Sequence, residues 1–218
     1  FMQVVLSFDS LSRVDGSARF GFGLYPQFLT SVSGPIEARL ASEQPSQTTI
    51  EVHVRPLSNV PGTESKKAAV ILKEVIQRQV IMEANPRTLV QFVVQALVPV
   101  KTSKITDELM AGMINSCTLS LLNTVSVPMR GVICAVSVGR DETSSYVVQP
   151  AEAQLLNAGG CFAFLFSDSD DSYTSSCVWT NWRSLRPHSN ASIGENDLVG
   201  ARNTARVAAR EVWERIKS

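Results

Sequence analysis

The stretch from Tyr146 to Phe166, YVVQPAEAQLLNAGGCFAFLF, has two apolar segments joined by a loop, a form in which enzymes often present catalytic carboxylates. Carboxylates in such a loop hold a divalent cation or transfer protons. The stretch nevertheless contains a single acid, Glu152, and one carboxylate makes a poor magnesium site. The nearest other acids are Asp141 and Glu142, which precede the first segment.

Histidine-dependent sites are also missing. A Ser–His–Asp or Cys–His site requires a histidine, and the chain has two. His53 falls on the polar face of an alternating strand, and His188 lies in the polar loop RPHSN without metal-ligand spacing. We therefore expect no metal site and no cofactor.

The composition is typical of an ordinary soluble globular protein. The 218 residues are 44% hydrophobic and 18% charged, enough to bury a sizeable core. Twenty basic residues balance 20 acidic ones, so RNA binding would need a local patch or partner chains. Apolar runs such as CFAFLF are too short to span a bilayer, and the N-terminus lacks a secretion signal.

The cysteines indicate the same kind of protein. They are dispersed, with no CxxC motif, and most lie in apolar stretches. We expect them to be reduced core residues of an intracellular chain. They are Cys117, Cys134, Cys161 and Cys177.

The first half of the chain predicts strands, a helix and a returning strand. RFGFGLYPQFLTSVSGP has the pattern of two strands around a turn at Leu24–Gln27, and TTIEVHVRP alternates as a strand. A helix is expected from Lys66 to Glu83, because apolar residues recur at helical spacing until Asn85–Pro86 stops it. TLVQFVVQALVPV then returns as a strand.

The second half predicts two helices around buried strands. GVICAVSV and CFAFLF are strands, and SDSDDSYTSS forms the tip of a hairpin. One helix begins near Thr106, with a core stripe of Leu109, Met113, Cys117 and Leu121. The last helix runs from about Ser192, capped by Ser192 or Asn196. Its expected core residues are Leu198, Val199, Ala205, Val212 and Trp213. Without a linker, this order predicts one α+β domain with helices packed on a mixed sheet.

Several short strings carry a family resemblance. RVDGSARF at Arg13–Phe20, NPRT at Asn85–Thr88 and VPMRG at Val127–Gly131 occur in this order at wide spacing. With VSGPIEAR, they resemble the RNase PH family of phosphate-dependent 3′→5′ exoribonucleases and RNA exosome ring subunits. The likeness starts near Arg13 and reaches the final helix. It implies an RNase PH-like domain (ribosomal protein S5 domain 2-like) over 13–218, preceded by an N-terminal arm or tag residue over 1–12.

The resemblance also implies where catalytic acids would stand. Active members carry an aspartate on the strand, another six positions on, and a third six beyond that. Without gaps, these positions are Val148, Gln154 and Gly160 here. None of them can act as a base or supply a carboxylate to a cation, which implies a chain without catalytic residues that is not an enzyme.

A second part of the family site is altered as well. Active members present Gly-Ser/Thr-Arg at the start of the second helix, where backbone N–H groups and the helix dipole hold phosphate. The corresponding region here is KTSKITDEL, with no Gly-Ser/Thr-Arg. Asp107 and Glu108 would stabilise the helix start and repel an incoming anion.

RNA contact is the property that such a chain could retain. Active members grip the RNA backbone with arginines before the first long helix, where this chain reads TESKKAAV. Lys66 and Lys67 are therefore candidate phosphate contacts, with Arg55 across the loop. A solvated helix start is the alternative for this stretch.

Other arginines fit structural or surface positions. A four-residue-spaced stripe on the last helix, with an Arg210–Glu214 pair, is expected to face solvent or a partner. It comprises Arg202, Arg206 and Arg210. Arg87 and Arg130 sit at element boundaries and are expected to hold structure.

The function implied by the resemblance is a non-catalytic ring subunit of the eukaryotic RNA exosome core. Such subunits pair into a six-membered ring that threads single-stranded RNA to a nuclease, supporting rRNA maturation and RNA turnover. The implied partners are other RNase PH-like subunits, with exosome component 8 in the dimer, and the S1/KH cap subunits. The implied location is the nucleus and nucleolus, and also the cytoplasm, without membrane association.

Two alternatives stay open. One is an active 3′→5′ exoribonuclease, phosphate-dependent or hydrolytic, working as a homodimer with Asp141 and Glu142 as displaced acids. The other is a binding module outside any RNA machine, because one fold hosts many functions.

Overall fold

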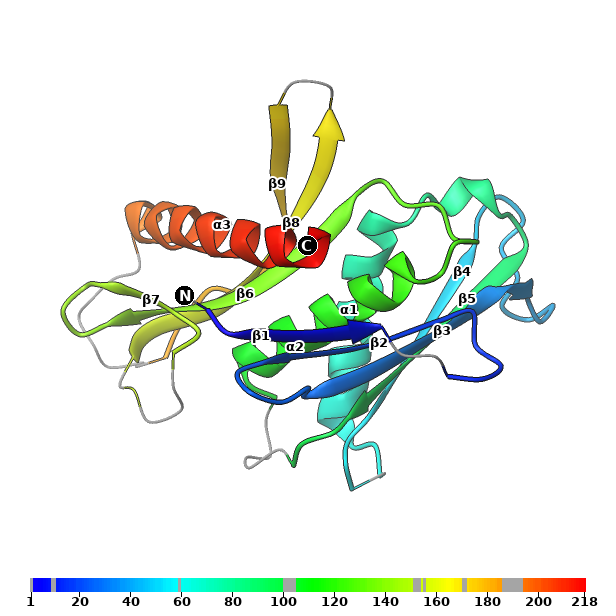
Figure 1. The fold of residues 1–218 in the computed structure, drawn as a ribbon, viewed down its shortest axis with the longest axis horizontal. Coiled ribbons are helices and arrows are strands. Elements are labelled where there is room, and N and C mark those ends of the chain that lie inside the picture. Colours follow the sequence, from blue (N-terminus) through cyan, green and yellow to red (C-terminus); the bar gives the residue numbers. More distant parts are fainter. Residues whose placement is uncertain are drawn as a thin grey trace.

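The molecule is built in layers, with a central helix between two β-sheets (Figure 1). The computed structural model describes residues 2–8, 11–58, 60–99, 105–150, 154, 156–169, 172–185 and 194–218, with backbone alone at 168–169 and 172–173. Helices α1 and α2 pack on the first sheet, and α3 packs on the second (Figure 1). Within these residues, no helix is long and apolar enough to cross a membrane.

The first sheet is mixed, as the sequence predicts. Its strand order is β1-β2-β3-β5-β4, and only the β4–β5 pair is parallel. The strands are β1 (Val4–Phe8), β2 (Gly16–Phe22), β3 (Phe28–Glu37), β4 (Thr49–Arg55) and β5 (Thr88–Ala96). Alternating apolar residues fill its inner face, where Phe20, Phe28 and Phe92 are fully buried. Strand β1 falls within residues 1–12, so this segment supplies an edge strand.

Helix α1 (Thr63–Gln79) is displaced from its expected range of Lys66–Glu83. It begins three residues earlier and ends four earlier, because Val80 is extended (ψ 142°) and forms an isolated bridge with Met129. Residues Met82–Ala84 form a separate 3₁₀ turn, η1.

Helix α2 (Asp107–Leu122) starts where the sequence predicts, but it has no solvated face along most of its length. Every residue from 110 to 121 is buried, because both sheets pack against this helix. Its polar residues are therefore paired. Asn115 donates to the Ala135 carbonyl (2.8 Å) and accepts from the Ala135 amide (2.7 Å), which ties α2 to the second sheet.

The second sheet is antiparallel, with the order β10-β8-β6-β7 and β9 paired to β8. Its strands are β6 (Val132–Asp141), β7 (Tyr146–Val148), β8 (Leu156–Ser169), β9 (Ser172–Thr180) and β10 (Arg183–Ser184). Strands β8 and β9 form the expected hairpin, which projects from the body of the molecule (Figure 1).

Helix α3 (Glu195–Lys217) starts later than expected, and Gly194 is its N-cap. Asn196 lies inside the first turn, so it is not the cap, and Ser192 lies outside the described residues. The Asp197 carboxylate accepts from the Gly194 amide at 3.1 Å and from Arg140 Nη1 at 2.7 Å. Ala205, Val212 and Trp213 are buried as predicted.

The first turns of α3 depart from the prediction. Leu198 and Val199 are 37% and 49% exposed, so the expectation that they face the core is wrong. Trp213 near the other end stacks on Phe166 of β8, with ring centroids 5.2 Å apart. The apolar contact of α3 is therefore concentrated in its middle and C-terminal turns.

Candidate functional site

The N-terminus of α2 is the first part of the site. Thr106 Oγ1 accepts a hydrogen bond from the Leu109 amide at 3.3 Å and caps the helix. Asp107 and Glu108 fill the first turn, as the sequence predicts. Residues 101–104, which complete the KTSKITDEL stretch, lie outside the described residues.

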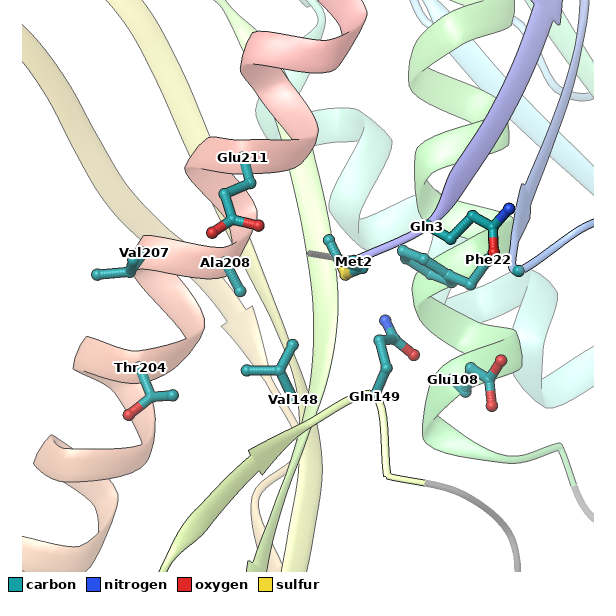
Figure 2. Close-up of a pocket in the computed structure, with 11 residues that line it drawn as sticks. Met2, Gln3, Phe22, Glu108, Val148, Gln149, Thr204, Val207, Ala208 and Glu211 are labelled. Carbon is teal, nitrogen blue, oxygen red and sulfur yellow. The ribbon is translucent and has the colours of Figure 1, made fainter.

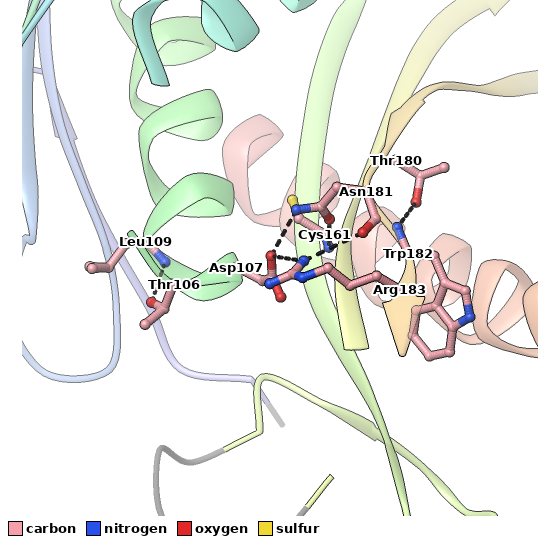
Figure 3. A network of polar contacts seen from close by, with 8 residues as sticks. All are labelled: Thr106, Asp107, Leu109, Cys161, Thr180, Asn181, Trp182 and Arg183. Atoms are coloured by element: carbon pink, nitrogen blue, oxygen red, sulfur yellow. Dashed lines mark hydrogen bonds and ion pairs between the residues drawn. The ribbon is translucent and has the colours of Figure 1, made fainter. Parts of the chain in front are cut away.

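Asp107 is the centre of a polar network that sequence reasoning missed (Figure 3). Its Oδ1 accepts from Asn181 Nδ2 at 2.8 Å and from Arg183 Nη1 at 2.9 Å. Asn181 Oδ1 in turn accepts from the Cys161 amide at 2.6 Å. The positive end of the α2 dipole is thus occupied by the chain's own carboxylate, and a cation from the second sheet already binds that carboxylate.

Val148 and Gly160, two of the positions expected to be degenerate, lie level with each other on the second sheet. Both pair with Val138, one from β7 and the other from β8. Gln154 lies in the connection before β8 and is half-buried. The structure therefore brings the first and third positions together across one strand.

Val138, Val148 and Gly160 form a row across the sheet, on the face that packs against α3. Directly paired residues share a face of the sheet, and residues two apart on a strand do as well. Phe166 follows Gly160 on β8 by six residues, an even number, so both point to the same face of the sheet. Phe166 stacks on Trp213 of α3. Cys161 faces the other way, toward α2, and the charge of Asp107 helps to raise its pKa.

A shift of one residue in the alignment would turn every side chain to the opposite face. The shifted positions are Gln149, Leu155 and Cys161, of which Gln149 and Cys161 lie beside the α2 end of the site. Leu155 lies outside the described residues. Neither alignment contains aspartate or glutamate at any of its three positions.

Gly160 has no room for a side chain. A Cβ atom there would lie 2.7 Å from Trp182 Cα and 2.8 Å from Trp182 N. These neighbours are backbone atoms of the segment that joins β9 to β10, which cannot move as a flexible side chain would. An acid at this position would displace that segment.

Gln149 is a second residue that sequence reasoning missed. It follows β7 in a left-handed conformation (φ 51°), and its Oε1 accepts from Ser137 Oγ at 2.9 Å. Its Nε2 is buried without an acceptor among the described residues. Gln149 lines a cavity of about 780 Å³ that also includes Glu108 and Val148 (Figure 2).

The acids considered as replacements lie elsewhere. Asp141 is three residues beyond Val138 on β6, about 10 Å along the strand at about 3.3 Å per residue. Its Oδ1 accepts from the Glu142 amide at 2.6 Å, and its own amide donates to the Ser145 carbonyl at 2.9 Å, which closes the β6–β7 turn. Glu152 lies outside the described residues. Across the part of the chain that the structure describes, no group of three His, Cys, Asp or Glu residues could hold a metal ion.

The candidate RNA contacts are separated. Lys66 and Lys67 are exposed in the first two turns of α1, and Arg55 is exposed at the end of β4. Lys67 lines a hollow of about 520 Å³ together with Asp107 and Arg183. The structure therefore associates Lys67 with the α2 end of the site.

Arg130 and Arg210 form ion pairs with nearby glutamates, and the described histidine is on the surface. Arg130 pairs with Glu83 at 3.3 Å. Arg210 pairs with Glu214 at 3.0 Å, as the four-residue spacing predicts. His53 is exposed on β4, as expected.

The described cysteines are free and most of them are buried, as predicted. Burial raises the pKa of Cys117 to about 12 and also raises the pKa of Cys134. Burial, followed by the charge of Asp107, raises the pKa of Cys161. These thiols stay protonated at neutral pH and are poor nucleophiles.

Comparisons with known proteins agree with the resemblance read from the sequence. A model of the 3′ exoribonuclease family, domain 1 (RNase PH), matches residues 1–126. This match begins at residue 1, so it includes the twelve residues that we expected to lie outside the likeness.

The curated relatives are components of RNA exosomes. Exosome complex component rrp46 of Schizosaccharomyces pombe is 28% identical over 127 residues, covering 58% of this chain and about half (53%) of the relative. Exosome complex component RRP46 of Saccharomyces cerevisiae is 27% identical over 156 residues, covering 71% and 69%. The Exosome complex exonuclease RRP46 homolog of Oryza sativa subsp. japonica is 24% identical over 146 residues, covering 67% and 58%.

Solved structures show the same fold. The crystal structure of rice Rrp46 superposes with a TM-score of 0.82 at 19% identity, covering 100% of this chain and 94% of that one. A chain of an archaeal exosome core gives a TM-score of 0.72 at 17% identity, covering 100% and 88%. Within the family, VDGSARF and VSGPIEAR are most similar to the exosome component 5 subunit, the RRP46 type, and the relatives confirm that likeness.

Proposed function

The chain belongs to the 3′ exoribonuclease (RNase PH) family, and we propose that it is a non-catalytic ring subunit of a eukaryotic RNA exosome core. In this role it supports 3′→5′ RNA processing and degradation, including rRNA maturation, by helping to form the channel through which RNA is threaded. The chain itself would hold no metal and no cofactor.

The observation that carries the proposal is the Asp107–Arg183 ion pair at the start of α2 (2.9 Å). In active relatives this helix end binds inorganic phosphate, the attacking group in phosphorolysis. A bound phosphate would need the helix N-terminus, and here a half-buried carboxylate occupies it. A phosphate would have to displace this carboxylate from Arg183 and Asn181.

The missing acids support the same proposal. Valine, glutamine and glycine occupy the three family positions in the ungapped alignment, and glutamine, leucine and cysteine occupy them after a shift of one residue. Neither set can hold a divalent cation through carboxylates or act as a general base at neutral pH. The crowding at Gly160 supports the proposal, because a side chain at the third position of the ungapped alignment would meet the Trp182 backbone.

Assembly would provide what the isolated chain lacks. The sequence has no net charge, so RNA binding would depend on cations pooled from several subunits around a channel. We place Lys67, Lys66 and Arg55 among these cations, as sequence-independent phosphate contacts. The proposed partners are other RNase PH-like subunits, with exosome component 8 in the dimer, and the S1/KH cap subunits, in the nucleus, nucleolus and cytoplasm.

Co-assembly tests this function. The purified chain, mixed with the other RNase PH-like subunits and the cap subunits, is expected to elute from a size-exclusion column in one particle with them. A chain that remains apart from these subunits would contradict the ring role and favour a binding module with a different partner.

A second candidate function is an active 3′→5′ exoribonuclease that works as a homodimer. The similarity to the rice Exosome complex exonuclease RRP46 homolog favours it. Asp141 and Glu142 would then have to supply the acids from the β6–β7 turn. Sedimentation equilibrium of the isolated chain distinguishes the ring subunit from the homodimeric enzyme, because a homodimer has twice the chain mass of 23.7 kDa.

A further inference from the structure

The cavity beside the α2 end of the site has walls from four elements (Figure 2). We call it the α2–α3 cavity. It measures about 780 Å³, within the range of about 300–1,000 Å³ that is usual for binding pockets. Its lining is partly apolar. It includes Met2, Gln3, Glu108, Gln149, Thr204 and Glu211.

The charges of this lining are of one sign. Glu108 projects from α2 and Glu211 from α3, on opposite sides of the cavity (Figure 2). No lysine or arginine is among the lining residues that the structure describes. Glu108 accepts only a long hydrogen bond from Gln27 (3.4 Å), and Glu211 has no ion pair within the described ranges. The cavity therefore attracts a cation and repels a phosphate.

An unsatisfied amide lies between these two carboxylates. Gln149 Nε2 points toward Met2 while its oxygen lies on the Glu108 side (Figure 2), and this nitrogen is buried without an acceptor in the described structure. A buried donor without a partner is costly, at about 1–3 kcal/mol. A ligand that supplies a carbonyl oxygen together with a positive charge would satisfy all three groups.

The cavity continues as a groove, which we call the β1–α3 groove. A second hollow of about 450 Å³ shares Met2, Gln3 and Glu211 with the cavity and extends to Ser218. The lining of α3 thus runs from Thr204 to Ser218, about 21 Å at about 1.5 Å per residue. The opposite wall is residues 2–4, which lead into β1, and the outer edge of β1 has no paired strand in the described sheet. Glu214 and Arg215 also line this second hollow.

We propose that the β1–α3 groove binds an extended segment of a partner protein, whose main chain pairs with β1 and whose lysine or arginine side chain enters the α2–α3 cavity between Glu108 and Glu211. The length fits about six residues of extended chain at about 3.3 Å each. An edge strand offers main-chain hydrogen bonds, and the cavity offers a pocket for one side chain. This inference extends the proposed assembly role by naming a surface and the chemistry of the segment that it takes.

Two measurements test this inference on the whole chain. Fluorescence anisotropy is measured with a fluorescein-labelled Thr-Lys-Thr-Arg-Thr peptide, against a Thr-Glu-Thr-Glu-Thr peptide. We expect the basic peptide alone to bind. Glu108→Gln and Glu211→Gln should each weaken binding by about two- to fivefold, and the double variant should weaken it further. Glu74→Gln, which removes an exposed acid on α1, should leave binding unchanged.

The outcomes separate this inference from the ring role. Equal binding of both peptides, no binding of either, or an unaltered affinity of the double variant would overturn the groove proposal. Co-assembly with the ring subunits is then measured for the same variants. A double variant that dissociates from the ring at lower salt than the wild type supports the groove as an assembly contact. Peptide binding by a chain that does not join the ring would leave the groove proposal standing and contradict the ring role.

Discussion

Arg183 Nη1 lies 2.9 Å from Asp107 Oδ1, and this ion pair joins the second sheet to the start of α2 across 76 residues of sequence. The Asp107 side chain is mostly buried and the Arg183 side chain is half-exposed, so the pair is partly shielded from water. The Asp107 carboxylate also accepts a hydrogen bond from the side-chain amide of Asn181, which fixes the carboxylate in place.

Replacement of Asp107 should destabilise the fold. Asp107→Ala removes the ion pair, the bond from Asn181 and the favourable charge at the helix start, so the free energy of unfolding should fall by about 1–2 kcal/mol. Urea denaturation of the wild type and the variant measures this change. The matched change Glu74→Ala on α1 should alter stability by less than about 0.5 kcal/mol. Equal effects of the two substitutions would contradict a structural role for Asp107.

The crowding at Gly160 gives a second prediction. Gly160→Ala should lower the free energy of unfolding by roughly 1–3 kcal/mol, because the added methyl group meets the Trp182 backbone. The neighbouring Gly159 is a natural control, since a Cβ there would meet the flexible Leu185 side chain at 3.1 Å. Gly159→Ala should therefore cost less. Thermal unfolding of both variants tests this order, and a neutral Gly160→Ala would show that the position has space.

Contact with RNA gives a third prediction, for the assembled ring. Lys67→Gln should weaken RNA binding modestly for all sequences and reduce the salt dependence by about one charge. Arg78→Gln is the control. Arg78 is exposed in the last turn of α1, at the opposite end of this helix from Lys67. Anisotropy titrations at several salt concentrations measure both. An equal loss for the two variants would argue against a specific phosphate contact.

The buried cysteines predict the response to alkali. The folded-state pKa of Cys117 is raised to about 12, above the ordinary thiol value of 9.0, so folding favours the protonated thiol. This contribution is complete below about pH 9 and is lost as the pH rises toward 12. Cys117→Ala should therefore show a smaller fall in stability between about pH 8 and pH 10 than the wild type does. If the stability of the wild type and of Cys117→Ala fell equally over this pH range, the Cys117 thiol would not ionise on unfolding.

Local patterns in the sequence were sufficient for most of the fold. A turn pattern located β2 and β3, alternation located β4, β-branched residues located β5, and the Thr106 cap located the start of α2. The burial of α2 on all sides was missed because it depends on a second sheet, which a periodicity within one helix does not reveal. The exposure of Leu198 and Val199 was missed because the first turn of α3 meets the second sheet through polar contacts, in which Asp197 binds Arg140 and Tyr146.

The composition of the site can be read from the sequence, whereas its geometry cannot. The absence of acids at Val148, Gln154 and Gly160 is a property of the sequence, but the face on which these residues lie depends on strand register. Arg183 and Asn181 gave no signal, because a contact across 76 residues leaves no local pattern. Gln149 carried one hint, as a polar residue between an apolar strand and a proline.

The release of nucleoside diphosphates tests the central claim most directly. The purified chain is incubated with single-stranded RNA, inorganic phosphate and Mg²⁺, and the products are separated by ion-exchange chromatography. We predict no nucleoside diphosphate above the level without protein, because no bound phosphate and no carboxylate pair would be available at the α2 end of the site. Phosphate-dependent release that disappears in Asp141→Asn and Glu142→Gln variants would contradict the account.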